Sequence, residues 1–206
     1  MFAIGRRELI LGASALALAA CNQGGAGVSS ADEMSIGSAD APVTLVEYAS
    51  TTCPHCAEFH ETAWEQLKTN YIDTGRVRYV FREFPTAPAP VAVAGFQVAR
   101  CGGASPEQYF TRIGEIFRTQ QALFQTIQSD GGRQYFINLG DAAGLTQEQV
   151  LACIADEGGA ERVRRVVEAS QGDNVTGTPT FVINGTKFEQ APTYENISRA
   201  LDAAGA

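Results

Sequence analysis

The sequence predicts a single α/β domain in which an all-helical insertion divides the strand-forming segments into two groups. Alternating or β-branched apolar patterns, which are typical of strands, occur over residues 43–49, 76–83 and 179–188. Between the last two segments, residues 90–171 contain several helical patterns and no convincing strand pattern. We therefore expect a mixed sheet built from both ends of the domain, with the insertion at about residues 88–172.

Residues 1–21 are expected to form a signal peptide that precedes the fold. Arg6 and Arg7 are followed by an apolar run that is too short to span a bilayer as a stable helix. The run ends in Leu-Ala-Ala-Cys21, which resembles the lipobox of bacterial lipoproteins, where the cysteine is lipidated and becomes the mature N-terminus. Ordinary cleavage after a small residue is the alternative, and the paired arginines also resemble a twin-arginine export signal.

Residues 22–36 are rich in Gly, Ser and Ala, have no periodicity, and are expected to be a flexible tether between the anchor and the domain. The remaining residues, 37–206, suit one domain that can bury a sizeable core. The formal net charge of the whole chain is −8 and no basic run offsets it, which argues against nucleic-acid binding.

Two cysteines lie at a predicted junction between a strand and a helix. Val43–Ala49 is expected to be a buried strand, and apolar residues recur at helical spacing from Phe59 onward. Pro54 suits the first helical position, because its missing N–H group is not needed there and its fixed φ matches helix entry. Cys53 is then the N-cap residue, within reach of solvent, whereas Cys56 faces the core. Their spacing permits a disulfide.

This placement indicates redox chemistry at the two cysteines. The unpaired N–H groups and the dipole of a helix N-terminus stabilise a thiolate, and His55 adds a donor or a positive charge near Cys53. A stable thiolate stabilises the reduced pair, which makes the disulfide strongly oxidising. We expect Cys53 to attack or be attacked and Cys56 to resolve the mixed disulfide. An inert disulfide or half of a zinc site is the alternative.

The remaining elements follow from local patterns. Residues 76–83 alternate as a strand, and Asn184-Gly185 is a two-residue hairpin turn between strands that begin at residues 179 and 187. The expected helices, several of them opened by Ser or Thr caps, cover residues 91–101, 106–120, 133–139, 146–156, 160–171 and 193–203.

The motif Cys53-Pro54-His55-Cys56 at the end of a strand resembles the active site of the DsbA family. The segments Ala-Pro-Val-Thr-Leu-Val-Glu-Tyr before it and Gly-Thr-Pro-Thr-Phe-Val-Ile-Asn-Gly after the insertion extend the resemblance from about Gly37 to the C-terminus. The resemblance implies a thioredoxin-like fold interrupted by an all-helical insertion. It also implies a thiol:disulfide oxidoreductase, and we expect no cofactor.

The resemblance implies a substrate-binding role for Thr178 and Pro179. Proline at the start of a strand is tolerated because the first residue needs no ladder donor. In the family this proline is cis and faces the cysteines, so that the backbone of Thr178 can pair with an extended substrate segment. Thr178 differs from the valine usual in the family's oxidases and is also met in disulfide isomerases, which leaves the oxidase and isomerase alternatives open.

Glu47 is a candidate for proton transfer beneath the cysteines. It shares strand parity with Val43 and Leu45, so its side chain is expected to point into the domain, and the resembled family carries a glutamate at this offset. A buried carboxylate there could carry the proton of Cys56 during exchange. The alternative is a partly solvated glutamate at a strand end. His60 is expected to be a surface residue at the rim, without a role.

The cysteine count supports a second pair in the insertion. The chain has five cysteines, of which lipidation would consume Cys21 and redox chemistry would use two. Cys101 and Cys153 remain, at the ends of two predicted helices, and some members of the resembled family carry such a pair in this region. We expect a structural disulfide between them. Two buried free thiols are the alternative, less suited to an oxidising compartment.

These observations together predict a periplasmic oxidoreductase, tethered to a membrane by an N-terminal lipid, that donates the Cys53–Cys56 disulfide to exported proteins. Cleavage without lipidation would instead give a soluble periplasmic protein. The resemblance implies a membrane quinone-linked reoxidase of the DsbB type as partner, and we expect a monomer. The alternatives are a reductase or isomerase of the same fold, or a metal-binding module using Cys53, Cys56 and His60. Since ligands for a metal are few, no metal is expected.

Overall fold

The computed structural model describes residues 33–129 and 131–206. The predicted signal peptide, its lipobox residue Cys21 and most of the predicted tether lie outside these described residues. Within the described part of the chain, no helix combines the length and the apolar character that crossing a membrane requires.

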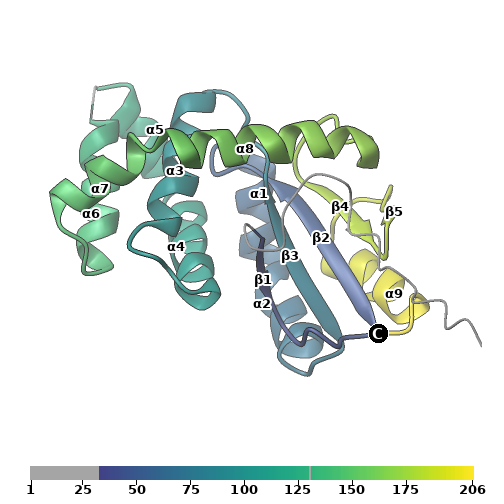
Figure 1. Ribbon diagram of the computed structural model, residues 1–206. Helices are drawn as coiled ribbons and strands as arrows, with labels where there is room; N and C mark the ends of the chain where they lie inside the picture. Colours follow the sequence, from purple (N-terminus) through teal and green to yellow (C-terminus); the bar gives the residue numbers. More distant parts are fainter. Residues whose placement is uncertain (1–32, 130) are drawn as a thin grey trace, which may run out of the picture.

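A mixed five-stranded sheet forms the centre of the fold, in the order β1-β3-β2-β4-β5 (Figure 1). The central strand β2 runs parallel to β3 and antiparallel to β4, while β1 and β5 pair antiparallel at the two edges. Both neighbours of β2 therefore protect its backbone hydrogen bonds. The strands are β1 (Met34–Ile36), β2 (Val43–Ala49), β3 (Val77–Glu83), β4 (Thr180–Ile183) and β5 (Thr186–Lys187).

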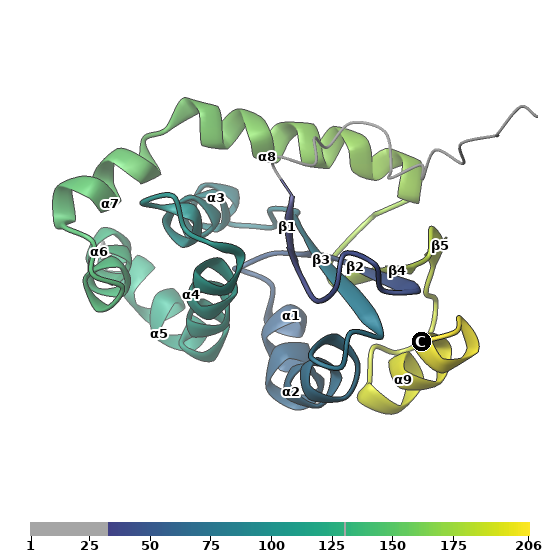
Figure 2. The same cartoon turned by 60° about the horizontal axis from the view of Figure 1, so that its bottom comes forward.

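Helices cover both faces of the sheet and extend to one side of it. Figure 2 shows α1, α2 and α9 beneath the sheet and α8 lying across the opposite face. The helical elements are α1 (Pro54–Phe59), η1 (His60–Trp64), α2 (Glu65–Leu67), η2 (Lys68–Ile72), α3 (Ala89–Arg100), α4 (Pro106–Arg118), α5 (Gln120–Ile127), α6 (Gly132–Ala142), α7 (Gln147–Ile154), α8 (Glu157–Ala169), η3 (Ser170–Asp173) and α9 (Tyr194–Ala203). The α/β fold with a helical insertion is thus confirmed.

The insertion has an apolar core of its own, separate from the core beneath the sheet. The side chains of α3 to α7 pack together around Val98, Ile116, Leu123 and Val150. Helix α8 then returns along the sheet, where Val166 packs against the far face. The insertion therefore has its own core beside the sheet, while side chains of α3 and α4 such as Phe96 and Ile113 also pack into the main core and α8 returns along the sheet (Figure 1).

Two elements were not expected from the sequence, and one boundary was wrong. Met34–Ile36 forms β1, paired with β3, so the predicted tether cannot extend to residue 36. The helix expected over residues 106–120 ends at Arg118, and a separate helix α5 follows after a break at Thr119, whose ψ is 15°. The helix after Pro54 also contains two π-helical stretches, η1 and η2, whose wider turns shift side chains relative to α-helical spacing.

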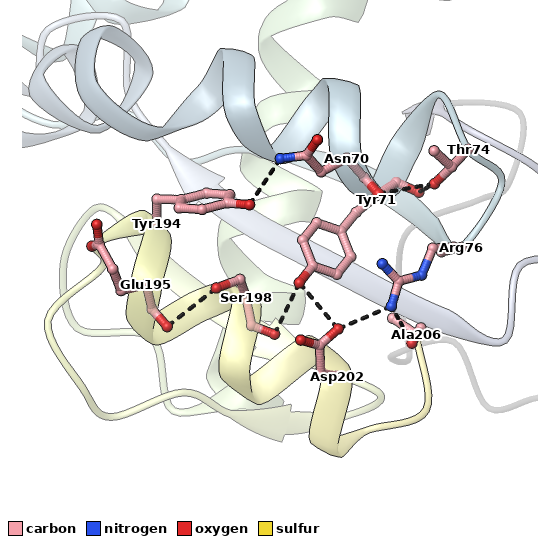
Figure 3. A network of polar contacts seen from close by, with 9 residues as sticks. All are labelled: Asn70, Tyr71, Thr74, Arg76, Tyr194, Glu195, Ser198, Asp202 and Ala206. Atoms are coloured by element: carbon pink, nitrogen blue, oxygen red, sulfur yellow. Dashed lines mark hydrogen bonds and ion pairs between the residues drawn. The ribbon is translucent and has the colours of Figure 1, made fainter.

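A polar network fixes the last helix against the end of η2 (Figure 3). The hydroxyl of Tyr71 donates to Asp202 at 3.0 Å, and Arg76 binds Asp202 at 2.9 Å and the carbonyl of Ala206 at 2.6 Å. Asn70 donates to the hydroxyl of Tyr194 at 2.8 Å. These contacts pair the two helical segments that cover the lower face of the sheet, at the end of the molecule away from the insertion.

A buried carboxylate at the end of β3 connects the sheet to the insertion. Glu83 accepts from Arg100 of α3 at 2.7 Å and from the hydroxyl of Tyr109 of α4 at 3.0 Å. Arg162 of α8 lies 3.7 Å from its other oxygen. Three helices of the insertion therefore converge on one side chain of the sheet, which fixes their position relative to β3.

Candidate redox site

The cysteine motif lies where the central strand gives way to the first helix. Cys53 has extended φ and ψ angles of −89° and 117°, and its sulfur accepts a hydrogen bond from the backbone N–H of Cys56 at 3.3 Å. Pro54 occupies the first helical turn, where its missing N–H group costs nothing. Both cysteines are free thiols, so the structure describes the reduced form of the site.

The two sulfurs are both shielded, although to different depths. Cys56 is 0% exposed, as its core-facing position predicted, whereas Cys53 is 5% exposed. The expectation that Cys53 lies open to solvent is therefore wrong in this structure. The loop before β4 covers its sulfur, and that loop is distant in sequence and cannot be inferred from the helix alone.

The environment separates the pKa values of the two thiols. The Cys56 thiol donates to the Cys53 sulfur, and this bond, with lesser help from Thr178 and the backbone N–H groups of Cys56 and His55, lowers the pKa of Cys53 to about 6 despite partial burial. Burial raises the pKa of Cys56, and the negative charge of Glu47 raises it further. Cys53 is thus the more acidic of the two thiols, and Cys56 stays protonated at neutral pH when the pair is reduced.

The loop before β4 faces the cysteines from across the site. The Thr178–Pro179 peptide bond is cis, and the Cys53 thiol donates to the carbonyl oxygen of Thr178 at 3.2 Å. The hydroxyl of Thr178 is buried and has no hydrogen-bond partner among the described residues, yet it contributes to the low pKa of Cys53. It is thus close enough to stabilise a thiolate once the thiol proton has left.

His55 contributes differently from what the sequence suggests. Its side chain is 78% exposed and its Nδ1 lies 3.3 Å from a carboxylate oxygen of Glu58 on the same helix. Its contribution to the low pKa of Cys53 comes from its backbone N–H and is smaller than that of the Cys56 thiol. The imidazole is therefore a rim group beside the site, paired with an exposed carboxylate.

Beneath Cys56, the side chain of Glu47 is buried at the centre of the sheet. Glu47 is 0% exposed and accepts from the hydroxyl of Tyr79 on β3 and from His60 Nε2, the latter at 3.2 Å. The alternative of a partly solvated glutamate is wrong. The expectation that His60 is a surface residue is also wrong, because its side chain is only 6% exposed. Packing of α4 against η1 covers it.

Gln120 was not identified from the sequence as part of the site. This buried residue of α5 donates its amide to the carbonyl oxygens of both Thr51 and Cys53, at 3.0 Å each. The insertion thus holds the loop that carries the nucleophile. No local pattern signals this contact, since glutamine is common on helix surfaces and α5 itself was not expected.

A groove of about 560 Å³ opens beside the cysteines, between α1 and the loops that flank β4 and α9. Its lining combines apolar groups with backbone of the cis-proline loop and includes His55, Phe59, Pro179, Pro192 and Tyr194. An extended peptide that lies in this groove passes the edge of Thr178. The groove therefore joins His55 of the cysteine motif to the cis-proline loop.

The other cysteines form a disulfide inside the insertion. The Cα atoms of Cys101, which follows α3, and of Cys153 in α7 are 5.7 Å apart and 52 residues separate them in sequence. The pair is distant from the redox site in the fold. Among residues 33–129 and 131–206, no cluster of three or more His, Cys, Asp or Glu side chains is placed to hold a metal ion.

The fold and the free dithiol at a strand–helix junction define a thioredoxin-fold protein with two cysteines of unequal acidity. The family model described as thioredoxin matches residues 29–203, and the chain therefore belongs to this family. A relative from Rickettsia bellii, with the curated name "Putative protein-disulfide oxidoreductase", is 32% identical over 174 residues, which are 84% of this chain and 64% of the relative. The chain spans less than two thirds of the length of such relatives.

The solved structures that are similar place the fold with DsbA-like proteins. Wolbachia pipientis alpha-DsbA1 matches with a TM-score of 0.76 and 24% identity, over 86% of this chain and 92% of that protein. A structure described as a protein-disulfide isomerase from Novosphingobium aromaticivorans matches with a TM-score of 0.72 and 21% identity, over 85% and 98% of the two chains. The thioredoxin-like fold with an all-helical insertion is therefore confirmed.

Proposed function

We propose that the chain is a protein thiol:disulfide oxidoreductase that works through Cys53 and Cys56. Family membership and the name of the Rickettsia relative support the class of activity. The observation that carries the proposal is the unequal pair of thiols, one with a pKa of about 6 and the other with a pKa raised by burial. Such a pair supplies one nucleophile and one protected resolving thiol.

The geometry fits a two-step exchange. A substrate thiolate attacks the Cys53 sulfur of the disulfide form, the Cys53–Cys56 bond breaks, and the electron pair leaves on Cys56, which takes up a proton. A second substrate thiolate then attacks the substrate sulfur of the mixed disulfide and releases Cys53 as a thiolate. The substrate loses two electrons, and the cysteine pair gains them. The substrate also releases two thiol protons. Cys56 takes up the equivalent of one, and the other goes to solvent because Cys53 leaves as a thiolate.

We propose oxidation of substrate as the physiological direction. The low pKa of Cys53 stabilises the reduced pair, and a stable reduced pair makes the disulfide an oxidant. The decisive measurement is the equilibrium between the pair and a glutathione buffer. A potential well above thioredoxin's value of about −270 mV supports an oxidase, and a value near it would leave a reductase.

An isomerase is the second candidate. Thr178 before the cis-proline and the isomerase description of the Novosphingobium structure favour it. Refolding of a substrate with scrambled disulfides separates the two, because an isomerase in its reduced form restores native pairs, whereas an oxidase in its disulfide form acts on the fully reduced substrate.

We further propose that the substrate is an extended segment of an exported protein that pairs with the backbone of Thr178. The groove beside Cys53 and the carbonyl of Thr178, 3.2 Å from the sulfur, support this mode of binding. A Cys56→Ser variant, which cannot resolve the mixed disulfide, should trap such substrates on Cys53. Trapping on Cys53→Ser instead would reverse the two roles.

The N-terminal sequence supports export and a lipid tether through Cys21, with soluble periplasmic release after ordinary cleavage as the alternative. A Cys21→Ser variant should move to the soluble periplasmic fraction and keep its redox activity in vitro. Membrane retention of the variant would contradict the tether.

We also propose that a DsbB-type membrane quinone reductase reoxidises the cysteine pair and that the protein is a monomer. Reoxidation by quinone-containing membranes and sedimentation equilibrium test these two proposals.

A further inference from the structure

His60 lies between the buried acid of the redox site and a cavity on the outside of its helix. Its Nε2 is 3.2 Å from Glu47 Oε2, and both side chains are almost fully buried. On its other side, His60 lines a cavity of about 560 Å³ between η1 and α4, together with Glu61, Trp64, Gly114 and Phe117. His60 therefore contacts the acid through one ring nitrogen and also forms part of the cavity wall.

Aromatic packing holds the imidazole in this position. The ring of Phe117 is stacked on it with centroids 4.4 Å apart, and the ring of Trp64 lies 5.0 Å away on a tilt of 33°. Packing between two aromatic rings restricts ring flipping, so that Nε2 stays directed at Glu47.

Each member of the pair keeps one unused polar atom. Glu47 Oε1 and His60 Nδ1 are buried and have no hydrogen-bond partner among the described residues. Buried polar atoms are normally bonded, and leaving two unpaired costs stability. The unpaired oxygen lies on the acid beneath Cys56, and the unpaired nitrogen lies on an imidazole whose residue forms part of the cavity wall. A proton-transfer route requires two such ends.

The other titratable and charged groups near Glu47 and His60 are Tyr79, the Arg118–Glu115 ion pair and Glu61. Burial and the Glu47 charge raise the pKa of Tyr79 from β3 well above its ordinary value, so that its hydroxyl stays protonated and only donates. From α4, Arg118 and Glu115 form an ion pair with each other at the cavity lining. From η1, Glu61 lines the cavity as well.

We propose that His60 is a proton-relay residue that connects Glu47, and through it Cys56, to water in the cavity. The inference rests on the proposed exchange at the Cys53–Cys56 pair. His60 does not touch the reacting sulfurs, and it acts through Glu47.

The relay supplies the proton that balances each reduction. When a thiolate breaks the disulfide, Cys56 leaves with the electron pair and Glu47 transfers a proton to its sulfur. His60 then passes a proton to Glu47 and recovers one from water in the cavity, and on reoxidation each transfer reverses. Cys56 has a pKa raised by burial, so it leaves poorly as an unprotonated thiolate. Since Cys56 and Glu47 are both 0% exposed, water does not reach them directly.

The test uses the rate at which excess dithiothreitol reduces the disulfide form of the full chain, measured between pH 5 and 9. A His60→Gln variant keeps a donor to Glu47 but cannot transfer a proton. We expect its rate to fall between about tenfold and a hundredfold, with the pH dependence flattened. The equilibrium between the Cys53–Cys56 pair and glutathione should stay unchanged, because the relay changes the rates of reduction and reoxidation by the same factor. A Glu61→Gln variant, which alters a titratable group of the same cavity, serves as the control and should match the wild type.

Chemical rescue separates proton transfer from structural support. A His60→Ala variant leaves space that adds to the cavity, and imidazole in the buffer should restore its rate in proportion to imidazole concentration. Gly114 lines the cavity and a Cβ there meets no atom within 4 Å, so Gly114→Leu is expected to fill part of the cavity. In the Gly114→Leu/His60→Ala double variant rescue should be lost, whereas Gly114→Ala/His60→Ala should keep it.

Trp64, the single tryptophan of the chain, gives a readout that does not depend on turnover. Its fluorescence reports on ring packing at His60, and an unchanged emission spectrum in His60→Gln would show that the variant keeps this packing. A wild-type rate and pH profile in His60→Gln, or rescue that survives Gly114→Leu, would overturn the relay. If dithiothreitol does not reduce the pair at all, the proposed exchange itself fails, which is a separate result.

Discussion

At the scale of single residues, the site depends on giving two identical thiols opposite environments. The Cys53 sulfur accepts hydrogen bonds at a helix N-terminus, whereas Cys56 is buried above a carboxylate. The same hydrogen bond contributes to both shifts, since the Cys56 thiol donates it and the Cys53 sulfur accepts it. The two pKa values are therefore coupled, and changing either residue changes both.

Alkylation of the reduced protein measures this coupling. With a pKa of about 6, roughly nine-tenths of Cys53 is thiolate at pH 7, so its reaction with iodoacetamide should rise through a midpoint near pH 6. A depressed thiol pKa stabilises the reduced fold above that midpoint, and this stabilisation is lost as the pH falls through it. In Cys56→Ala, which removes the largest cause of the shift, the midpoint should move upward. An unchanged midpoint would show that the helix terminus alone sets it.

His55→Ala provides the comparison for that experiment. The variant keeps the backbone N–H that acts on Cys53 and removes an exposed imidazole paired with Glu58. Its midpoint should therefore move less than that of Cys56→Ala.

The sequence predicted which residues lie at the site better than it predicted their exposure. The spacing of the motif and the strand parity of Glu47 are local properties, and the structure places these residues together. The burial of Cys53 depends on the loop at Thr178, and that of His60 depends on Phe117 of the insertion. Both partners are distant in sequence, so local patterns carried no signal for either.

At the scale of elements, α5 supports the active-site loop through one side chain. Gln120→Ala would leave the carbonyl oxygens of Thr51 and Cys53 without this donor, at a cost of about 1–3 kcal/mol in the free energy of unfolding. Gln121→Ala, its exposed neighbour on the same helix, is the matched control and should change stability by less than about 0.5 kcal/mol. Urea denaturation of both variants measures the difference, and equal losses would show that the bonds of Gln120 to the active-site loop are not the cause.

Neither of the two unexpected elements, β1 and α5, is marked by a local sequence pattern. Strand β1 has three residues, which is too short for a periodic pattern, and its place comes from pairing with β3. Helix α5 follows α4 without any Gly or Pro to mark the break at Thr119, and no helix was expected from residue 121 to 127. By contrast, the Asn184-Gly185 turn was predicted correctly, because both residues take the positive φ that this turn requires.

At the scale of the whole molecule, the Cys101–Cys153 disulfide links α3 and α7 across the insertion. It closes a loop with a sequence separation of 52, and such cross-links typically contribute about 2–4 kcal/mol by restricting the unfolded chain. The Cys101→Ser/Cys153→Ser double variant should lose that much stability in urea denaturation, while the alkylation midpoint of Cys53 stays unchanged. A variant of wild-type stability would mean that packing of the insertion alone fixes these helices.

The contact of Glu83 with the insertion predicts a larger loss. Glu83→Ala would leave Arg100 and Arg162 without this carboxylate in a buried setting, and removing one partner of a buried ion pair costs about 3–5 kcal/mol. Asp73→Ala, which breaks the exposed pair with Lys68, should cost about 1 kcal/mol or less. Thermal denaturation compares the two, and similar losses would show that Glu83 is not the main link between sheet and insertion.

The order of segments predicted the fold, but not how the insertion docks. Strand patterns on both sides of a helical region were enough to expect an interrupted α/β domain, as the structure confirms. The docking depends on side chains such as Glu83 and Gln120, which carry no periodic signal in the sequence.

The distance in sequence between the two halves of the site has a consequence for how the molecule acquires its native state. Thr178 lies 125 residues after Cys53, and both cysteines of the insertion lie between them. A chain made from its N-terminus therefore exposes the thiols of both the redox pair and the insertion before the loop that covers Cys53 exists. Once an oxidant in the surrounding compartment removes two electrons from any two of these thiols and joins them, attack by a third thiolate can move the disulfide to another pair. Intermediates with a wrong disulfide, such as Cys53–Cys101, can therefore form before the fold is complete. Maturation of this protein depends on correct pairing of its own cysteines.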